Sequence, residues 1–473
     1  MNLYLCTAEV VCFANDNDAM VPEKWAFEGL AQLEEQMVVA NLVHRDFENE
    51  IAKYGDTVNA HRPGEFKIRR KTDATTSLDK QDATTANVPV KLNQWFYNAF
   101  VIKDGEQSKS FKDLVALHLV PSMRTIARSV DRALLGHIHK FLSMGTPAGR
   151  VGRLQNLPAA TSHETVLEAR EILNSNNAPL DEARSLILSS MSETALLKND
   201  MFLKANERGD GGQALEDARL GRILGFNTYL AQNVPYANAL STDYVAGTVT
   251  GAEVAGKTGE ITVSLAGVAI VGEFINVAGN DQPTWATAVT ASGSTTGVTL
   301  NEALKYATGA GAVLTRYKAA NVVAGQIAGY DGQIQVSHTS AKAPQVGQLL
   351  AFGTGGSRHT YTIIEVDVVS GTNTKVMLDR PLDYNINTST WAFPGPAGSM
   401  NWAMHRECVA LVTRPLAVPA NSLGVLSGVG AYNDIAMRVT MQYDIDAGGT
   451  VVNCDILAGI KELDANLAVA LLG

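Results

Sequence analysis

The stretch SFKDLVALHLVPSMRTIARSVDRALLGHIHKFLSM, residues 110–144, decides the fold, because it predicts a long amphipathic helix. Ser110 and Asp113 form a capping box, which marks a helix N-terminus. After Pro121 the apolar side chains recur at steps of three and four residues, so they share one face. These side chains are Ile126, Val130, Leu134, Ile138 and Phe141. Because Pro121 lacks a backbone N–H, we expect a kink there, or two abutting helices.

Three arginines lie on roughly the opposite side of this helix. Arg124, Arg128 and Arg132 follow one another at four-residue spacing. Most rows of charge at helical spacing are only solvated faces. The alternative is a contact surface for an acidic partner, and the segments on either side of the helix favour it.

The N-terminal segments predict a helix followed by a long hairpin. Pro22 opens a helix that is expected to end near Leu42, and its apolar stripe is Ala26, Leu30, Leu33, Met37 and Ala40. Two alternating strands, at 66–70 and 88–92, flank the polar tract KTDATTSLDKQDATTAN. An isolated hairpin is marginally stable in water, so this one must lean on another element. A second subunit is the obvious candidate.

Residues 240–396 differ sharply from the rest, since Gly, Thr, Val and Ala dominate and helical patterns vanish. The segment repeats itself, which predicts two tandem small barrels of about six strands each, at about 247–318 and 325–396. Chance similarity between Gly- and Val-rich strands is the alternative. The paired segments are GEITVSLAGVAIVGEFINVAG (259–279) with GQIQVSHTSAKAPQVGQLLAFG (332–353), and VTLNEALKY (298–306) with VMLDRPLDY (376–384).

Mixed structure flanks this β-rich segment on both sides. Before it, we expect a helix from Ser162 or His163 to Asn174, a buried strand at 185–189 and a helix capped by Ser192. After it, residues 435–445 alternate apolar and polar side chains, with Tyr443 and Ile445 on the apolar side. The fold class is therefore α+β, interrupted by an all-β insertion.

Net charge, cysteine spacing and the distribution of apolar residues argue against several classes of function. The 473 residues carry a net charge of -10 and no basic cluster, which disfavours direct nucleic-acid binding. The cysteines Cys6, Cys12, Cys408 and Cys454 have no metal-ligand or redox spacing. Residues 1–14 are apolar but lack the positive start of a signal peptide, and no run is long enough to span a membrane.

Few motifs in the sequence suggest a catalytic, phosphate-binding or metal-binding site. GTGGS (353–357) lacks the P-loop lysine and fits an ordinary β-turn. His137 and His139 are two residues apart on a helix, so they cannot easily share a metal ion. Asp444 and Asp446 lie at a strand end, where carboxylates are usually solvated. We therefore expect no enzyme activity, no cofactor and no metal.

Four segments resemble the major capsid (coat) protein of tailed double-stranded DNA bacteriophages, closest to the coat proteins of short-tailed enterobacterial phages with an inserted β domain. The most specific pieces are VHRDF with GDTVN, the helix with Pro121, Ala127 and Asp131, and HRECVALVTRP. The ending RVTMQYDIDAGG with DILAG also resembles the last strands of that family. The four segments are NLVHRDFENEIAKYGDTVNAHRPGEF (41–66), VPVKLNQWF (88–96), DLVALHLVPSMRTIARSVDRALL (113–135) and AMHRECVALVTRPLAVP (403–419).

The resemblance implies the Hong Kong 97-type capsid fold with an inserted β module. Relatives of this branch carry one inserted barrel, so two tandem units depart from the pattern and leave open which of them does the usual work. The implied divisions are an N-terminal arm (1–54), an extended loop (55–108), the spine helix of the peripheral domain (109–145), a first axial and peripheral part (146–239), the β module (240–396) and a second axial and peripheral part (397–473).

The resemblance also implies a function and partners. The chain would be a structural protein that assembles as hexamers and pentamers into an icosahedral shell around phage DNA, in the host cytoplasm, and resides in the virion. Implied partners are copies of itself, a scaffolding protein, a portal and a decoration or cement protein, with enclosed DNA bound without sequence specificity and no membrane. Inter-subunit contact candidates are Arg124, Arg128, Arg132, Lys71 and Lys80.

Two points stay open at this stage. Self-crosslinking in some relatives needs a lysine on the extended loop and an asparagine near the C-terminus. Lys71, Lys80 and Asn453 or Asn466 exist, but no motif pairs them. The alternative class is a phage decoration or fibre-type surface-displayed β-rich binding protein. That class should show a signal peptide, a trimeric β repeat or an exposed aromatic binding face, and none is evident in the sequence.

Overall fold

A computed structural model of the chain describes two compact units, each considered by itself. The first consists of Met1–Gln36, Trp95–Ala127 and Thr413–Leu457, and the second of Met37–Gln94, Arg128–Val412 and Ala458–Gly473. The described residues, with short gaps inside some ranges, are 26–45, 57–62, 86–103, 118–138, 155–156, 162–199, 202, 220–240, 245–354, 357–419 and 425–473, with Ile68, Arg70 and Lys80 individually.

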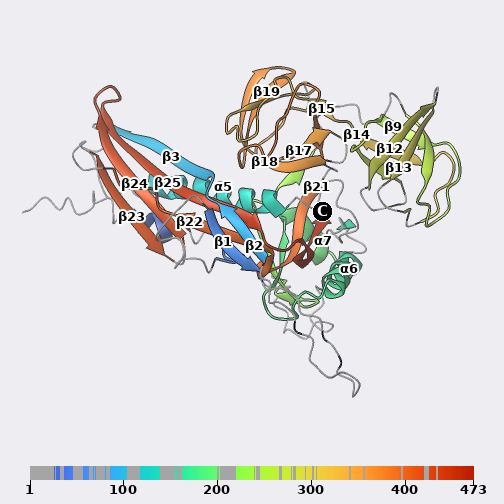
Figure 1. Cartoon of the computed structure of the whole chain (residues 1–473), viewed down its shortest axis with the longest axis horizontal. Coiled ribbons are helices and arrows are strands. Elements are labelled where there is room, and N and C mark those ends of the chain that lie inside the picture. Colours follow the sequence, from blue (N-terminus) through green and yellow to red (C-terminus); the bar gives the residue numbers. More distant parts are fainter. Residues whose placement is uncertain are drawn as a thin grey trace, which may run out of the picture. The chain divides into compact units, whose positions relative to one another are not determined.

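The helix α5 spans Val120–Ile138 (Figure 1). Its predicted apolar face is confirmed, since Ile126, Val130 and Leu134 are buried. Pro121 is the second residue of α5, and residues 118–119, which are of π type, run directly into the helix. The turn before Pro121, where the kink or helix junction is predicted, lies largely outside the described residues. The capping box and Phe141 lie outside the described residues.

A five-stranded sheet combines β3 with four strands that follow residue 408. Its order is β22-β25-β24-β23, and β3 also pairs with β25. The predicted alternation is confirmed from Ile435 to Met441, whose inward side chains are buried. It was wrong beyond that point, because Tyr443 and Ile445 are 52% and 83% exposed at the strand end. The strands are β3 (Gln94–Lys103), β22 (Val409–Arg414), β23 (Leu426–Tyr432), β24 (Ile435–Asp444) and β25 (Gly449–Glu462).

The predicted N-terminal helix is confirmed in part. Ala26, Leu30 and Leu33 are helical and buried. The expected end near Leu42 was wrong, because Met37–Ala40 form bends and a turn. The physical reason is that backbone N–H groups in this segment donate to a distant side-chain carboxylate instead of to helical carbonyls.

The hairpin of β1 (Thr57–Arg62) and β2 (Ala86–Lys91) is antiparallel, with Val58 opposite Val90. Its base packs on Ala410 and Val412 of β22, so it leans on its own chain there. The strand predicted at 66–70 was wrong, because the paired strand lies at 57–62 and Ile68 is fully exposed. Most of the polar tract between the strands lies outside the described residues.

A mixed sheet with two helices forms the body of the second unit. The predicted helix at 162–174 is confirmed as α6 (Ser162–Ser175), and the buried strand as β5. The N-cap of α7 (Ser190–Leu197) is Ser189, whose Oγ accepts from the N–H of Ser192, so the predicted cap at Ser192 was wrong. The sheet order is β4-β26-β21-β5-β7-β6, with β8 on β21. Its strands are β4 (Gln155–Asn156), β5 (Arg184–Leu188), β6 (Arg222–Ile223), β7 (Phe226–Leu230), β8 (Tyr236–Ala237), β21 (Gly398–His405) and β26 (Ala468–Leu472), and the short 3-10 turns are Arg406–Cys408 and Ala465–Leu467.

Two six-stranded β structures follow β8. The first is a closed barrel in the order β9-β10-β13-β12-β11-β14. The second has the order β15-β20-β17-β18-β19-β16, and a bridge between Val322 and Val336 joins its two ends. We call them the first barrel (245–317) and the second barrel (320–394). The strands are β9 (Val245–Val249), β10 (Glu260–Ser264), β11 (Phe274–Val277), β12 (Thr284–Ser292), β13 (Thr295–Leu300), β14 (Val313–Tyr317), β15 (Ala320–Asn321), β16 (Ile334–Ser337), β17 (Leu349–Thr354), β18 (Ser357–Ser370), β19 (Asn373–Leu378) and β20 (Trp391–Pro394).

The two barrels share one topology. Numbered within each barrel, the strands neighbour one another in the cyclic order 1-2-5-4-3-6 in both. The registers also agree, because Ile261 lies opposite Val298 in the first and Ile334 opposite Val376 in the second.

A turn repeats in the same way. The N–H of Gly256 donates to Leu304 O in the first barrel, and the N–H of Gly329 donates to Leu382 O in the second. Both glycines have a φ of about 81°, a conformation that other residues rarely adopt. The residue pairs that matched in the sequence therefore occupy equivalent places in the two barrels.

Candidate functional site

The arginine row on α5 divides into two parts. Arg124 and Arg128 are exposed, whereas Arg132 is half-buried. Burial and the nearby charge of Arg128 lower the pKa of Arg132. Its guanidinium lies beside Gly347, so that a Cβ on Gly347 would be 3.4 Å from the Arg132 Nε. Arg132 thus contacts its own chain, and Arg124 and Arg128 are the members of the row exposed to solvent.

The other predicted contact residues are only partly placed. Lys80 is exposed, and Lys71 lies outside the described residues. Asn453 donates from Nδ2 to Asp455 Oδ2 at 3.1 Å, and its Oδ1 is buried without a hydrogen-bond partner. No lysine among the described residues is paired with Asn453.

An exposed apolar row on β3 was missed by the sequence analysis. Trp95, Tyr97 and Val101 alternate along the strand and are 56%, 68% and 40% exposed. The rings of Trp95 and Tyr97 lie with their centroids 6.3 Å apart. The signal was available, because QWFYNAFVIK carries apolar side chains on both faces, and a strand apolar on both faces is normally covered on both.

A second missed residue is Asp131, which is fully buried on α5. Its Oδ2 accepts from the N–H of Val38 at 3.2 Å and its Oδ1 from the N–H of Ala40 at 3.3 Å. Burial raises its pKa to about 6, against the lowering effect of these hydrogen bonds and one from Asn233. Its helical position, four residues after Ala127 and three before Leu134, already placed this acid on the apolar side.

A buried cluster of charged side chains lies in the second barrel. Arg380 donates from NH1 to Asp379 Oδ2 at 3.0 Å and from NH2 to the carbonyl of Thr360 at 2.9 Å. Its guanidinium carbon is 4.3 Å from the centroid of the Tyr361 ring. Asp383 accepts from Tyr361 at 3.2 Å. Most of these polar atoms pair with one another, as in a structural network, although Arg380 Nε is buried without a hydrogen-bond partner.

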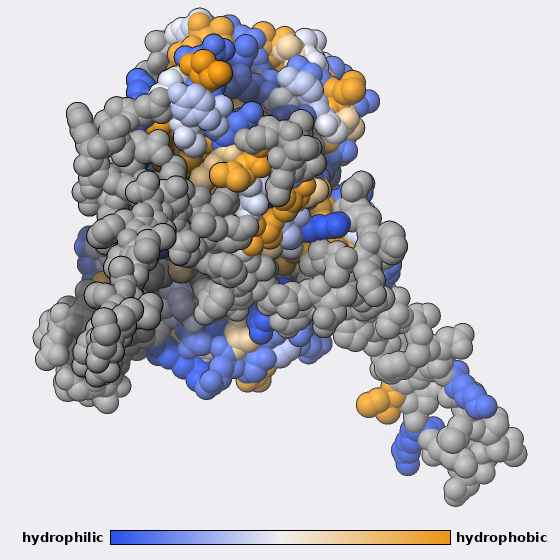
Figure 2. Space-filling model, turned by 90° about the vertical axis from the view of Figure 1, so that its left-hand side faces the viewer, coloured by the Kyte–Doolittle hydropathy of each residue, from blue (hydrophilic) through white to orange (hydrophobic). Residues whose placement is uncertain are grey.

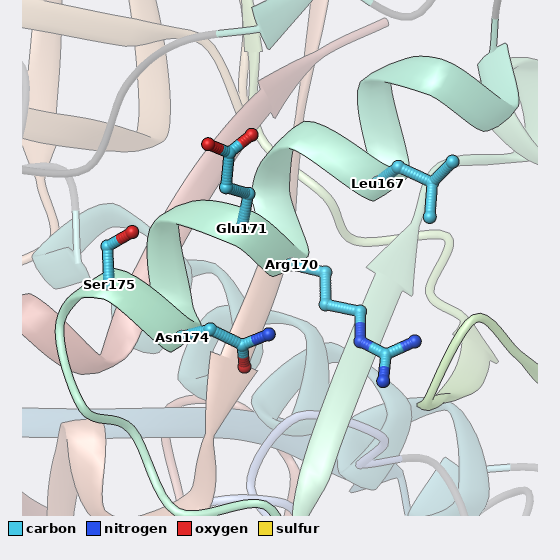
Figure 3. Close-up of a pocket in the computed structure, with 5 residues that line it drawn as sticks. All are labelled: Leu167, Arg170, Glu171, Asn174 and Ser175. Carbon is cyan, nitrogen blue, oxygen red and sulfur yellow. The ribbon is translucent and has the colours of Figure 1, made fainter.

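The described cavities do not gather reactive groups. One depression of about 530 Å³ has all its described lining residues on α6, and Figure 3 shows Arg170 and Glu171 pointing in different directions from that helix. A groove of about 630 Å³ runs along β24 and β25 and is lined by Thr440, Gln442, Tyr443, Asp444, Ile445, Asp446, Val451 and Asn453. Asp444 caps the following turn, since its Oδ1 accepts from the N–H of Asp446.

The remaining candidates from the sequence are the GTGGS motif and the cysteines, and their described residues can be located in the structure. GTGGS forms the end of the β17–β18 hairpin, with Thr354 opposite Ser357. Cys408 and Cys454 are buried free thiols, while Cys6 and Cys12 lie outside the described residues. Within the described part of the chain no cluster of His, Cys, Asp or Glu is arranged to hold a metal ion. No described helix has both the length and the apolar character to cross a membrane.

Hydrophobic and hydrophilic side chains are interspersed on the face drawn in Figure 2, among the residues that carry colour. That pattern is ordinary for a protein surface, where single apolar side chains are common. The β3 row differs because its members share one strand face, on which the aromatic residues Trp95 and Tyr97 are neighbours.

Comparisons with known proteins find solved structures of phage origin. No family model matches the chain, and no curated protein matches it. Mycobacterium phage Che8 is similar at 11% identity and a TM-score of 0.43, over 92% of this chain and 90% of the other. The capsid structure of the cyanophage P-SCSP1u is similar at 9% identity and a TM-score of 0.45, over 92% and 88%. The asymmetric unit of the bacteriophage PhiM1 mature capsid is similar at 10% identity and a TM-score of 0.38, over 88% and 82%.

Proposed function

We propose that this chain is a major capsid protein that assembles as hexamers and pentamers into the icosahedral shell of a tailed double-stranded DNA phage. The observation that carries the proposal is the exposed apolar row Trp95, Tyr97 and Val101 on β3. Trp and Tyr are enriched among the residues that carry binding energy at protein interfaces. A chain that leaves such a row uncovered suits a partner that covers it. The decoration or fibre alternative would also show an exposed aromatic face, so the row by itself indicates an interface. The family resemblance is what favours a second copy as the partner, as in a shell.

The sequence resemblance supports the same proposal. VHRDF with GDTVN, the helix around Pro121 and HRECVALVTRP occur in the family's order along the chain. On this proposal, the hairpin of β1 and β2 would correspond to the family's extended loop, and α5 to its spine helix. Hence a Hong Kong 97-type fold with the β module inserted is the architecture we propose.

The partners follow from the proposal. Exposed Arg124 and Arg128 would meet acidic side chains of a neighbouring copy, which the net charge of -10 makes abundant. Lys71 and Lys80, on the hairpin, are proposed as further contacts between subunits. A scaffolding protein, a portal and a decoration or cement protein are proposed from the resemblance. The chain would assemble in the host cytoplasm and enclose DNA without reading its sequence.

Electron microscopy of the purified chain, alone and with the scaffolding protein of its phage, tests the proposal. Icosahedral shells, tubes or capsomers are expected. A chain that stays monomeric at high concentration under both conditions would contradict it, and isolated trimers would favour the decoration or fibre alternative.

The double variant Trp95→Ser, Tyr97→Ser sharpens the test. It should keep the circular dichroism spectrum of the unchanged chain and lose assembly, because more than half of each side chain that it removes is exposed. Val254→Ser is the matched control, since Val254 is 69% exposed on a turn of the first barrel. Equal assembly by the double variant and the control would remove the β3 row from the argument.

A further inference from the structure

We propose that the two barrels have different structural roles. The second barrel holds the C-terminal half of α5 and the segment 236–240 together, and the first barrel takes no part in these contacts. The proposal does not depend on capsid assembly. It concerns only the second unit, to which all of these residues belong.

The second barrel approaches α5 closely at Gly136. A Cβ on Gly136 would overlap the Thr362 Oγ1 and would lie 3.4 Å from Asp379 Oδ2. Gly136 lies within α5 and does not have a positive φ. The absence of a side chain at this position therefore permits the close packing and is not needed for an unusual backbone conformation. Gly in a helix interior is less favourable than Ala by about 1 kcal/mol, which makes a packing role the physical reason for it here.

One turn earlier, Arg132 lies beside Gly347 of the second barrel. Gly347 has a φ of 87°, which favours glycine, and its carbonyl accepts from the N–H of Tyr236 at 3.1 Å. The Tyr236 hydroxyl donates to Gln345 Oε1 at 2.8 Å. The loop before β17 therefore contacts both α5 and β8.

The segment after β8 enters the second barrel itself. Leu240 is buried in the hydrophobic core that the second barrel forms around Ile334 and Phe352. Its carbonyl accepts from the N–H of Thr339 at 3.0 Å. The carbonyl of Asn238 accepts from Gln348 Nε2 at 2.9 Å. The chain is thus fixed to the second barrel before it begins the first.

The corresponding surface of the first barrel could not pack against α5 as the surface around Thr362 of the second barrel does. Trp285 lies opposite Phe274 on β11, as Thr362 lies opposite Leu349 on β17, so Trp285 occupies the place of Thr362. An indole is far too large for the space that admits the threonine side chain against Gly136. Instead, Phe274 and Tyr317 of the first barrel pack against Leu349 of the second.

Hydrogen exchange on the full chain tests this division with a matched pair of variants. Ile334→Ala and Ile261→Ala remove equivalent buried side chains, 1% and 2% exposed, from the two barrels. Ile334→Ala should speed exchange at least tenfold at the Tyr236 N–H and at the amides of residues 132–138. Ile261→Ala should speed exchange within the first barrel and leave those amides unchanged.

Three further variants keep the test decisive if Ile334→Ala prevents folding. Ile334→Val and Ile261→Val apply the same comparison with a smaller loss of volume. Gly136→Ala should speed exchange at the Tyr236 N–H without slowing or speeding exchange in the first barrel. The proposal is overturned if both barrels protect α5 equally, if neither does, or if only the first barrel does.

Discussion

Asp131 and Ala40 are 91 residues apart in the sequence, yet the carboxylate of Asp131 accepts a hydrogen bond from the Ala40 N–H at 3.3 Å inside the protein. The N–H of Val38 donates to the other carboxylate oxygen. Amide groups therefore solvate a carboxylate that water does not reach. A fully buried acid is costly to ionise, and the raised pKa of Asp131 reflects that cost.

This arrangement predicts a pH dependence of stability. The pKa of Asp131 rises from 3.8 to about 6 on folding, so the folded state holds the proton more tightly than the unfolded state. The contribution to stability is fully present below about pH 4 and is lost as the pH rises through 6. At about 1.4 kcal/mol per pKa unit, the loss is about 3 kcal/mol.

Urea unfolding between pH 4 and pH 7 measures that loss. Asp131→Asn should remove this part of the pH dependence while keeping one acceptor for the backbone. Asp131→Leu should lower stability at every pH, because it leaves the N–H groups of Val38 and Ala40 unpaired at about 1–3 kcal/mol each. An unchanged pH dependence in Asp131→Asn would show that other groups cause it.

The two kinds of arginine on α5 should respond differently to charge reversal. Arg128→Glu should slow or abolish assembly and change thermal stability by less than about 1 kcal/mol, because Arg128 is exposed. Arg132→Glu should lower thermal stability, because it places an acid beside Gly347. Light scattering at physiological salt and a thermal melt separate the two effects. Normal assembly of Arg128→Glu would mean that the exposed arginines are only solvated.

The buried pair of Arg316 and Glu273 predicts a large effect in the first barrel. Glu273 Oε2 accepts from Arg316 Nε at 2.6 Å, and its carboxylate also accepts from the N–H groups of Ile270 and Ala319. Glu273→Gln should cost about 3–5 kcal/mol, since it removes the carboxylate charge that faces the buried Arg316 guanidinium.

Calorimetry of the variants checks this value. Gln348 has the equivalent place in the second barrel and accepts from the N–H of Gln345 as Glu273 does from Ile270. The second barrel therefore folds with a neutral side chain there. Glu273→Gln, Arg316→Met should be less destabilised than Glu273→Gln alone. If the double variant loses more stability, the charge of Glu273 is not the cause.

The buried thiols should resist modification. Burial raises the pKa of Cys408 well above its usual value and that of Cys454 to about 12. A thiolate is the reactive form, so iodoacetamide at pH 7.5 should label neither residue in the folded chain. Peptide mass spectrometry before and after unfolding in urea checks this. Rapid labelling of Cys454 under native conditions would mean that β25 opens readily.

Local patterns in the sequence predicted much of the fold. The apolar stripe of α5, the helix at 162–174 and the alternation from Ile435 to Met441 are set by residues close in sequence, and the structure confirms them. The paired segments of the β module likewise occupy equivalent places in two barrels of one topology.

Local sequence patterns did not predict the features that depend on contacts between residues far apart in the chain. The end of the first helix depends on Asp131, which no local pattern near Met37 reveals. The strand at 57–62 is selected over 66–70 because Val58 and Val90 pack on Ala410 and Val412. The exposed row on β3 and the separation of Arg132 from Arg128 likewise depend on which surfaces other segments cover.

The position of Leu240 in the core of the second barrel determines the order in which segments can fold during translation. Leu240 leaves the ribosome before the first barrel, but its core partner Ile334 follows roughly 90 residues later. At about 5–20 residues per second, Leu240 waits roughly 5–20 s for the strands that cover it. The first barrel closes on itself and has all its strands in that interval. A nascent chain would therefore carry one finished domain while the segment that leads into it still awaits its partners.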